Sequence, residues 1–548
     1  MWTRIAQGSG SGRKSMRPGK PATIFVSRPW TFDVKPMLNP RNLFCWTLVV
    51  AGLVAPRQLE ADSFTTARDS VTADELRRHV EALANDTFEG REAGTRGGYA
   101  AAGYISQFFT RHHLSPAAGA GGYFQSFSGN YRNLLGLFEG SDPALKRQVI
   151  VVGAHYDHVG YGSARNSFGP TGFIHNGADD NASGDAALLE LIEAFARLEV
   201  RPKRSILFAF WDGEEKGLLG SKHWVAQPTI PLADVACMVN VDMIGRLRQD
   251  QLTIYGTRTL RGVRRLLSDQ NQPNLVLDFN WEMKADSDHY SFYERQIPIL
   301  MFHTGLHSDY HRPSDDVEKV NFSGLERIDR LMFGVVRALA DDPSPWAFRA
   351  QSRQEGLHSR PVLERLEPPL PGRLGLSWST SDPGPGLLVT RVWPNSAAAQ
   401  ADLRLNDRIL QLDGQSVQPG DDLRALVWGA SESLPLVVER AGESKPLDVT
   451  VRLGGAPVRF GITWREDDAE PGSLFLVRVV PGTPADKAGL QVLDRIYRVN
   501  GQEFANGVEF AKLLDAATGP VELLVEQWGR ERTVIIPLKP KPQPMAGQ

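Results

Sequence analysis

The chain has 548 residues and a formal net charge of −3. A chain of this length is too long for one domain, and two to four domains are expected. The near-neutral charge gives no sign of nucleic-acid binding, and the apolar and aromatic content is ordinary for a soluble globular protein.

An apolar run at residues 43–55 follows Arg41. About a dozen residues are too few for the ~20 that span a bilayer, but they match the core of a signal peptide. Because residues 1–36 are rich in Gly, Ser, Pro, Arg and Lys, we expect the true start to be Met37 and residues 1–61 to form a leader and signal peptide. The mature chain would then be periplasmic or secreted, without a stable membrane span. The alternative is that the run is a buried element of an N-terminal domain.

The chain contains two cysteines. Cys45 would leave with the signal peptide, so no disulfide is possible within one mature chain. Cys237 lies inside an apolar run and is expected to be a buried, inert thiol.

Helical and strand-like patterns alternate between residues 73 and 340. Strands that alternate with helices imply a largely parallel sheet covered on both faces, so the predicted fold is α/β with a mixed, largely parallel sheet. The expected helices are residues 73–89, 98–113, 182–198 and 322–340. The expected strands are residues 133–140, 148–155, 205–212, 235–242, 252–256 and 297–303.

The C-terminal part contains an internal repeat. Residues 345–370 are rich in Pro, Arg, Glu and Ser and are predicted to be a linker. Beyond them, residues 391–414 match residues 478–501 in pattern. Each copy is about 85 residues long, which is the size of a domain rather than of a solenoid repeat. We therefore expect two small β-rich domains, at residues 371–454 and 455–540.

Both copies resemble PDZ domains over nearly their whole length. The hydrophobic-Gly-hydrophobic loop of that family, matched here by residues 374–376 and 460–462, offers backbone N–H groups to the terminal carboxylate of a peptide. The second copy fits the family pattern well at residues 480–490, whereas the first has Asp402 where the family has Gly. The resemblance implies peptide or protein C-termini as partners. The alternative is that these domains pack on the catalytic unit and bind no free peptide.

Five side chains suited to metal binding follow one another along the chain, each at the end of an apolar run or in the loop after it. In open α/β sheets, ligands bind beyond the carboxyl ends of the strands. Two histidines and three carboxylates suit zinc, with one carboxylate left to bridge a second ion. The five predicted ligands are His155, Asp180, Glu215, Asp242 and His311.

Asp157 and the pair Asp179-Asp180 extend this predicted site. Asp157 lies two residues after His155 and so points to the same face, where a carboxylate can hold the other ring nitrogen of the imidazole. Only one of the two adjacent aspartates can aim at a given point, and helix capping explains one of them but not both.

Glu214 and Glu215 are also adjacent, so one can hold metal while the other acts as a general base. Around His311 the choice of ligand stays open, because other metal-binding side chains lie nearby in the sequence. These competitors are His307, Asp309, Asp315 and Asp316.

Residues from about 73 to 340 resemble the co-catalytic di-zinc aminopeptidase family, which also includes glutamate carboxypeptidase and glutaminyl cyclase. The motifs that carry the resemblance are EGREAGTRGG, VVGAHYDHVG, GADDNASG, DGEEKGLLGS, NVDMIG and DYHRPSD. The resemblance implies a zinc-exopeptidase-like fold for a peptidase domain at residues 62–344.

The resemblance also implies a cofactor of two zinc ions. Carried over position by position, His155 and Asp242 resemble the ligands of one ion, and Glu215 and His311 those of the other. Asp180, rather than its neighbour, matches the aspartate that bridges both ions.

Glu214 matches the general base of the family, and Asp157 matches the partner of His155. Tyr310 matches the tyrosine that helps to hold the oxyanion. The family also places a cis peptide bond after its bridging aspartate, so Asp180–Asn181 is predicted to be cis.

These residues predict an exported, zinc-dependent aminopeptidase that removes N-terminal residues from peptides. One alternative is a carboxypeptidase or other amidase that uses the same di-zinc site, and another is a binding protein with a relic catalytic fold. Glutaminyl cyclase is disfavoured, because the paired glutamates of DGEE and the intact NVDMIG fit the two-metal enzymes better. Substrate selection is expected to involve the PDZ pair.

Overall fold

The computed structural model describes residues 63–119 and 121–538. The predicted leader and signal peptide lie outside these residues. Within the described part of the chain, no helix combines the length and the apolar character that a membrane span requires.

Nine strands form one mixed sheet in the N-terminal part, and their bounds are β1 Ser115–Pro116, β2 Phe124–Phe127, β3 Tyr131–Phe138, β4 Val149–His155, β5 Ser205–Trp211, β6 Val235–Val241, β7 Gln251–Tyr255, β8 Val276–Asn280 and β9 Ile299–His303. The order is β1-β3-β5-β4-β6-β9-β7-β8, and β2 pairs with β3. The central strands β5, β4, β6 and β9 are parallel, whereas β3 and β7 run antiparallel to their central neighbours. The predicted mixed, largely parallel sheet is confirmed.

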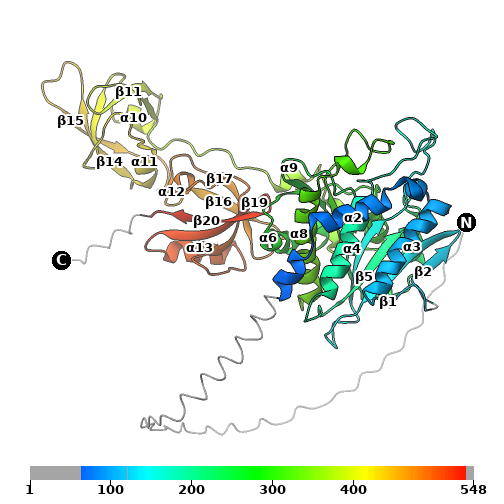
Figure 1. The fold of residues 1–548 in the computed structure, drawn as a ribbon. Coiled ribbons are helices and arrows are strands. Elements are labelled where there is room, and N and C mark those ends of the chain that lie inside the picture. Colours follow the sequence, from blue (N-terminus) through cyan, green and yellow to red (C-terminus); the bar gives the residue numbers. More distant parts are fainter. Residues whose placement is uncertain (1–62, 120, 539–548) are drawn as a thin grey trace, which may run out of the picture. The chain divides into compact units, whose positions relative to one another are not determined.

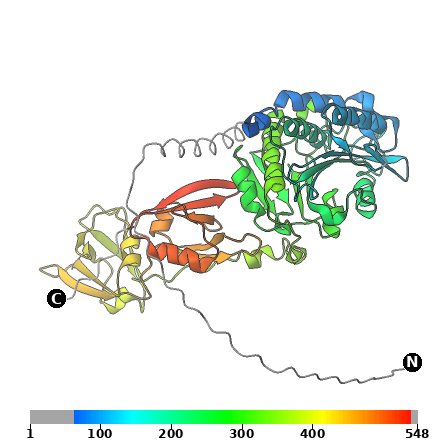
Figure 2. The ribbon, with the colours of Figure 1, turned by 90° about the horizontal axis from the view of Figure 1, so that it is seen from below.

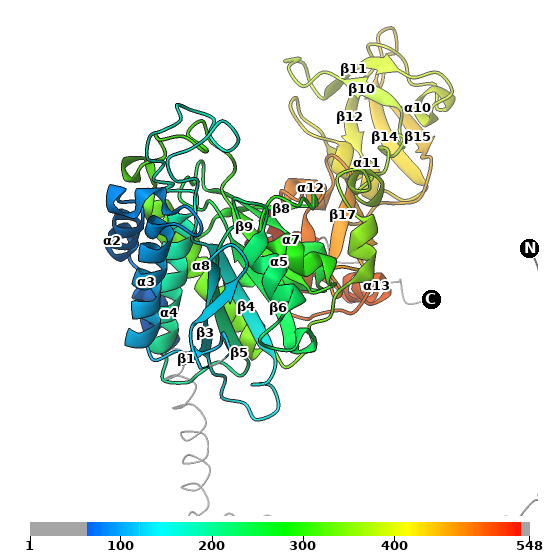
Figure 3. The same ribbon diagram turned by 90° about the vertical axis from the view of Figure 1, so that its right-hand side faces the viewer.

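Helices cover both faces of this sheet (Figures 1 and 3). One face carries α2 Ala73–Leu83, α3 Arg96–Arg111, α4 Ala182–Ala196 and α8 Phe322–Asp341. The other face carries α5 Leu219–Ala226 and α7 His289–Glu294. The remaining helical segments are η1 Asp86–Arg91, η2 Leu232–Asp234, η3 Thr257–Thr259, α6 Val263–Gln270 and η4 Val317–Lys319.

Strand β4 shows how the sheet divides two hydrophobic cores. Ile150 and Val152 belong to the core beneath α4 and α8, while Val149 and Val151 belong to the core beneath α5 and α7. Because successive side chains of a strand point to opposite faces, an apolar run without alternation fits a strand buried on both sides. Cys237 in β6 is fully buried, and burial raises the pKa of its thiol, as expected for an inert cysteine.

The sequence repeat folds into two sheets of matching strand order. The first, β10-β11-β12-β14-β15 with β13 beside β12, corresponds to the second, β16-β17-β18-β19-β20, whose last hairpin is drawn in red in Figure 2. Bounds in the first are β10 Leu376–Trp378, β11 Leu387–Val392, α10 Ala397–Gln400, β12 Arg408–Leu412, β13 Gln415–Ser416, α11 Arg424–Gly429, β14 Ser433–Glu439 and β15 Leu447–Arg452. Bounds in the second are β16 Ile462–Glu466, β17 Leu474–Val479, α12 Pro484–Lys487, β18 Arg495–Val499, α13 Gly507–Ala516, β19 Val521–Gln527 and β20 Arg530–Ile536.

The departure from the PDZ pattern at Asp402 leaves the local turn intact. Asp402 adopts a left-handed backbone with φ of 56°, close to the φ of 80° at its counterpart Gly489. Aspartate enters this region more readily than most residues, since its short polar side chain bonds locally.

The segment predicted to be a linker contains η5 Ala350–Gln354 and α9 Arg360–Leu363, and its first part is packed rather than extended. The guanidinium of Arg349 donates a hydrogen bond to the carboxylate of Glu355, at 2.7 Å, and another to the carboxylate of Asp468 in the second β-rich unit, at 3.0 Å. This unit also contacts the large sheet, because the backbone N–H of Leu277 in β8 donates to the carbonyl of Trp528, at 2.8 Å.

Candidate metal centre

The five predicted ligands come from segments that meet at the carboxyl edge of the parallel strands. His155 is the last residue of β4, and Asp242 directly follows the neighbouring strand β6. Glu215 lies in the loop after β5, Asp180 lies just before α4, and His311 lies in the loop after β9. The topology therefore brings together residues spread over more than a hundred positions of sequence.

His155, Asp180 and Asp242 form one cluster of donor atoms. Nε2 of His155 lies 3.4 Å from Oδ1 of Asp180 and 3.4 Å from Oδ1 of Asp242. Donor atoms on a tetrahedral zinc ion are about 3.3 Å apart when each bond is about 2.0 Å long. The spacing of these three side chains fits one zinc ion.

His311, Asp180 and Glu215 form a second cluster. Nε2 of His311 lies 3.2 Å from Oδ2 of Asp180 and 3.1 Å from Oε2 of Glu215. The two oxygens of Asp180 thus face two different histidines, which is the arrangement that a bridging carboxylate requires. The Asp180–Asn181 peptide bond is cis, as expected.

The buried polar atoms of this centre face one another. Nε2 of His311 and Oδ2 of Asp180 are buried, and their nearest polar neighbours are other charged groups of the centre. Burial opposes charge on His311, but the neighbouring carboxylates of Asp180 and Glu215 outweigh it and raise the pKa of the imidazole to about 10. Buried carboxylates at such spacing need a compensating cation, and the donor set suits zinc.

The adjacent aspartates have separate partners. While Asp180 faces the two histidines, Oδ1 of Asp179 accepts a hydrogen bond from the backbone of Gly245, at 2.6 Å, and Oδ2 lies 3.1 Å from Nε2 of His307. One carboxylate oxygen of Asp315 accepts from the backbone N–H groups of both aspartates, at 3.0 and 3.1 Å. His307 and Asp315, which the sequence left open as ligands, hold the loop in place instead.

Asp157 contacts His155 through a different atom from the one predicted. Nδ1 of His155 lies 3.0 Å from the backbone carbonyl oxygen of Asp157, not from its carboxylate. One oxygen of that carboxylate, Oδ1, accepts the backbone N–H of Glu214, at 3.0 Å, and the other makes no hydrogen bond. Asp157 still connects the imidazole to the loop that carries the predicted general base.

Glu214 and Glu215 differ in environment, although they are neighbours in sequence. For Glu214, burial together with the nearby charges of Glu215 and Asp288 outweighs the charge of His155 and raises the pKa well above its ordinary value. For Glu215, hydrogen bonds from His158 and His311 outweigh burial and hold the pKa at about 2. The two adjacent glutamates therefore differ in how readily each holds a proton.

The ring of Tyr310 stacks on the imidazole of His311, with centroids 3.9 Å apart and an interplanar angle of 27°. Burial, then the charges of Asp180 and Glu215, raise the pKa of its hydroxyl. Tyr310 is thereby kept as a neutral hydrogen-bond donor beside the candidate centre.

His158 is a residue of this centre that was not predicted from the sequence. Its Nδ1 lies 2.9 Å from Oε1 of Glu215, and its side chain is fully buried. The signal available in the sequence was a second histidine three residues after His155. Its pairing with Glu215 could not be predicted, because the two residues lie in different loops. Phe168 was also missed, and its ring stacks near His311 at a centroid distance of 5.6 Å.

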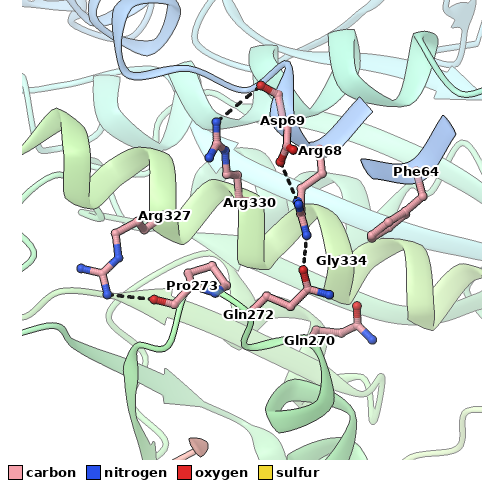
Figure 4. Close-up of a pocket in the computed structure, with 9 residues that line it drawn as sticks. All are labelled: Phe64, Arg68, Asp69, Gln270, Gln272, Pro273, Arg327, Arg330 and Gly334. Carbon is pink, nitrogen blue, oxygen red and sulfur yellow. Dashed lines mark hydrogen bonds and ion pairs between the residues drawn. The ribbon is translucent and has the colours of Figure 1, made fainter. Parts of the chain in front are cut away.

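A separate hollow of 230 Å³ (Figure 4) contains none of the predicted site residues. Its arginines donate to oxygens of the chain itself: Arg68 to the side chain of Gln272, Arg327 to the carbonyl of Pro273 and Arg330 to the carbonyl of Val71. These bonds use donors that an anionic ligand would need.

Comparison with known proteins agrees with this architecture. Residues 133–336 match peptidase family M28, and residues 388–440 and 475–527 match the PDZ domain. The chain therefore contains a domain of the M28 family and two PDZ domains.

Among similar proteins, the leupeptin-inactivating enzyme 1 of Streptomyces exfoliatus is 27% identical over 298 residues, which cover 51% of this chain and 61% of that protein. A probable leucine aminopeptidase of Arthroderma benhamiae is 28% identical over 220 residues, covering 36% of this chain and 56% of the relative. The chain therefore spans less than two thirds of the length of either relative. The LapA aminopeptidase of Legionella pneumophila has a solved structure that aligns at a TM-score of 0.42 with 20% identity, covering 53% of this chain and 76% of LapA.

Proposed function

We propose that the protein is an exported, zinc-dependent aminopeptidase that removes N-terminal residues from peptides. The observation that carries the proposal is the position of the Asp180 carboxylate between two histidines. Its Oδ1 lies 3.4 Å from Nε2 of His155, and its Oδ2 lies 3.2 Å from Nε2 of His311. His155 and Asp242 would hold one zinc ion, and His311 and Glu215 the other. Export rests on the signal-like run at residues 43–55.

Two bound zinc ions would polarise the scissile carbonyl and lower the pKa of a water toward ~7. Glu214, whose raised pKa equips it to carry a proton, would take the proton of that water and pass it to the leaving amine. Asp157 holds the backbone of Glu214 in place. Tyr310 would donate its hydroxyl hydrogen to the oxyanion.

The second PDZ domain supports peptide C-termini as further partners. A hollow of 330 Å³ between β16 and α13 is lined by side chains that include Phe460, Ile462, Trp464 and Leu514. An added strand along β16 would place a terminal carboxylate at the loop around Gly461. We infer that this groove contributes to the choice of peptide substrate.

The first test is hydrolysis of a leucine chromogenic amide and of its N-acetylated twin by purified 62–548, with and without chelator and zinc add-back. Zinc-dependent cleavage of the free-amine substrate alone is the expected result. Cleavage of neither substrate, with two zinc ions still bound, would favour a carboxypeptidase or other amidase. Absence of zinc binding would favour the binding-protein reading.

The role of Glu214 is tested by Glu214→Gln, which should keep both zinc ions and lose nearly all turnover. Glu199→Gln, at an exposed glutamate, is the matched control and should behave as wild type. A Glu214→Gln enzyme that retained more than about a tenth of the wild-type kcat would exclude this glutamate as the general base.

A further inference from the structure

The loop at residues 160–175 places an exposed aromatic ring beside the candidate metal centre. The backbone N–H of Phe168 donates to the carbonyl oxygen of His311, at 3.0 Å. The Phe168 ring lies nearly parallel to the imidazole of His311, at 26° and a centroid distance of 5.6 Å, and 5.7 Å from the ring of Tyr310. The ring therefore adjoins both a predicted zinc ligand and the predicted oxyanion donor.

This loop is held in shape by His175, which is fully buried. Nε2 of His175 lies 2.8 Å from Oγ of Ser167, and Nδ1 lies 2.9 Å from the carbonyl oxygen of Phe173. The backbone N–H of His175 donates to the carbonyl of Gly160, at 2.8 Å. Since Ser167 precedes Phe168 directly, these bonds fix the backbone that carries the ring.

Large apolar side chains on the segments around His311 are exposed to solvent. Phe168 and Phe173 are each 60% exposed, and Leu306, in the loop that leads to His311, is 64% exposed. Exposed apolar side chains beside a polar centre are typical of ligand-binding surfaces, where apolar walls surround a few placed polar groups. Nothing in the hydrogen bonding of the loop requires an aromatic ring at position 168, because the bond to His311 comes from the backbone.

We propose that Phe168 is a specificity-determining residue, which forms a wall of the subsite for an apolar side chain next to the scissile bond. The inference rests on the proposed peptidase function and deepens it, since it names peptides with a large apolar residue at that bond as the favoured substrates. The apolar residue is either the first of the peptide, which carries the free amine, or the second. The experiment separates these two.

The test compares kcat/KM of wild type, Phe168→Ala and Phe168→Leu on two substrate pairs. Leucyl and alanyl chromogenic amides vary the first residue, and the dipeptides Ala-Leu and Ala-Ala vary the second. Phe168→Ala should lower kcat/KM about tenfold for the leucine member of one pair and less than about threefold for its alanine partner, because the wall acts only on a side chain that reaches it. Phe168→Leu keeps an apolar wall and should retain most of the preference. Zinc content, measured by elemental analysis, should remain unchanged in both variants.

An equal loss on all four substrates, or a loss of zinc, would assign Phe168 a structural role and overturn the inference. If wild type hydrolysed the leucine and alanine members of both pairs equally well, the inference about Phe168 would be wrong, but the proposed function would stand. No turnover of any substrate by zinc-loaded wild type would overturn the proposed function, and the inference with it. Trp393→Ala, at an aromatic residue of the first PDZ domain that is 44% exposed, is the matched control.

Discussion

Nδ1 of His158 lies 2.9 Å from Oε1 of Glu215, and both side chains are buried. The other carboxylate oxygen of Glu215 lies 3.1 Å from Nε2 of His311. One oxygen is thus held by His158, and the other faces the second candidate zinc position. A hydrogen bond of this kind fixes the orientation of a ligating carboxylate and raises the affinity for metal.

We predict that His158→Ala weakens the binding of one of two zinc ions by roughly 10–100-fold, because Glu215 loses the group that orients it. The measurement is zinc competition against a chromogenic chelator, which reports both affinities without reference to turnover. His113→Ala, at an exposed histidine, is the control and should leave both affinities as in wild type. Two unchanged affinities in His158→Ala would show that Glu215 needs no such support.

Zinc binding should release protons near neutral pH. Burial opposes charge on His311, yet Asp180 and Glu215 raise its pKa to about 10, so the metal-free protein carries a proton where zinc must bind. Only the neutral imidazole is a ligand, and the affinity for zinc should therefore fall as the pH falls below about 10. Calorimetry at pH 7 in two buffers of different ionisation enthalpy measures the number of protons released, and a heat that is independent of the buffer would contradict the prediction.

The same raised pKa affects the stability of the metal-free protein. Because the folded-state pKa of His311 lies above its ordinary value of 6.5, the ion pairing contributes its full stabilisation below about pH 6.5. That contribution is lost as the pH rises through about 10. Bound zinc replaces the proton, so the pH dependence due to this group should be smaller in the zinc-loaded protein.

That the candidate ligands lie together could be predicted from sequence, because each ends or follows a run whose burial is visible in its composition. One apolar strand ends in His155 and another directly precedes Asp242. In a parallel sheet both strands end at the same edge, whichever strands lie beside them. For the adjacent aspartates the prediction required the resemblance as well, since periodicity does not decide which of two neighbours faces the candidate metal centre. The structure separates them through His307, whose ring pairs with Asp179.

Other features depend on contacts that carry no local signal. Oδ1 of Asp157 accepts the backbone N–H of Glu214, which follows a different strand, and the contact to His155 is made by the Asp157 carbonyl. Strand β8 was not predicted, because its five residues include Asp278 and form an edge of the sheet. Pairing across long sequence separations cannot be read from either partner alone.

The groove of the second PDZ domain offers a test that leaves the peptidase intact. Gly461 has a φ of 90°, and an added Cβ would lie 2.0 Å from Oγ1 of Thr483. Gly461→Ala should therefore distort the loop proposed to bind the carboxylate and weaken peptide binding by at least about tenfold, while a leucine amide is hydrolysed as before. Fluorescence anisotropy with a labelled peptide, free or amidated at its C-terminus, measures the loss.

Gly519→Ala is the matched control for this variant, since an added Cβ at Gly519 meets no atom within 4 Å. Equal peptide affinity in the two variants would place recognition outside this loop. Equal affinity for the free and the amidated peptide in wild type would exclude carboxylate recognition by the groove.

The last prediction concerns the ion pair between Arg264 of α6 and Glu526 of the second PDZ domain. The guanidinium donates to both carboxylate oxygens, at 2.9 and 3.1 Å, and the Glu526 side chain is fully buried. Arg264→Ala leaves a buried carboxylate without its partner, which should lower the free energy of unfolding by about 3–5 kcal/mol. Arg261→Ala, which removes an exposed pair with Asp468, should cost no more than about 1 kcal/mol.

Urea unfolding of both variants and of the Arg264→Met/Glu526→Met double variant checks this prediction. The double variant should be markedly less destabilised than Arg264→Ala, because no buried charge is left unpaired. Equal effects of Arg264→Ala and Arg261→Ala would mean that the Arg264 pair is solvated and contributes little. If the prediction holds, a variant that lacks residues 346–548, and with them both PDZ domains, would also leave Arg264 without its partner. A change in peptide kinetics in such a variant would therefore not isolate the effect on substrate selection. Substitution at Gly461 tests selection without disturbing this contact.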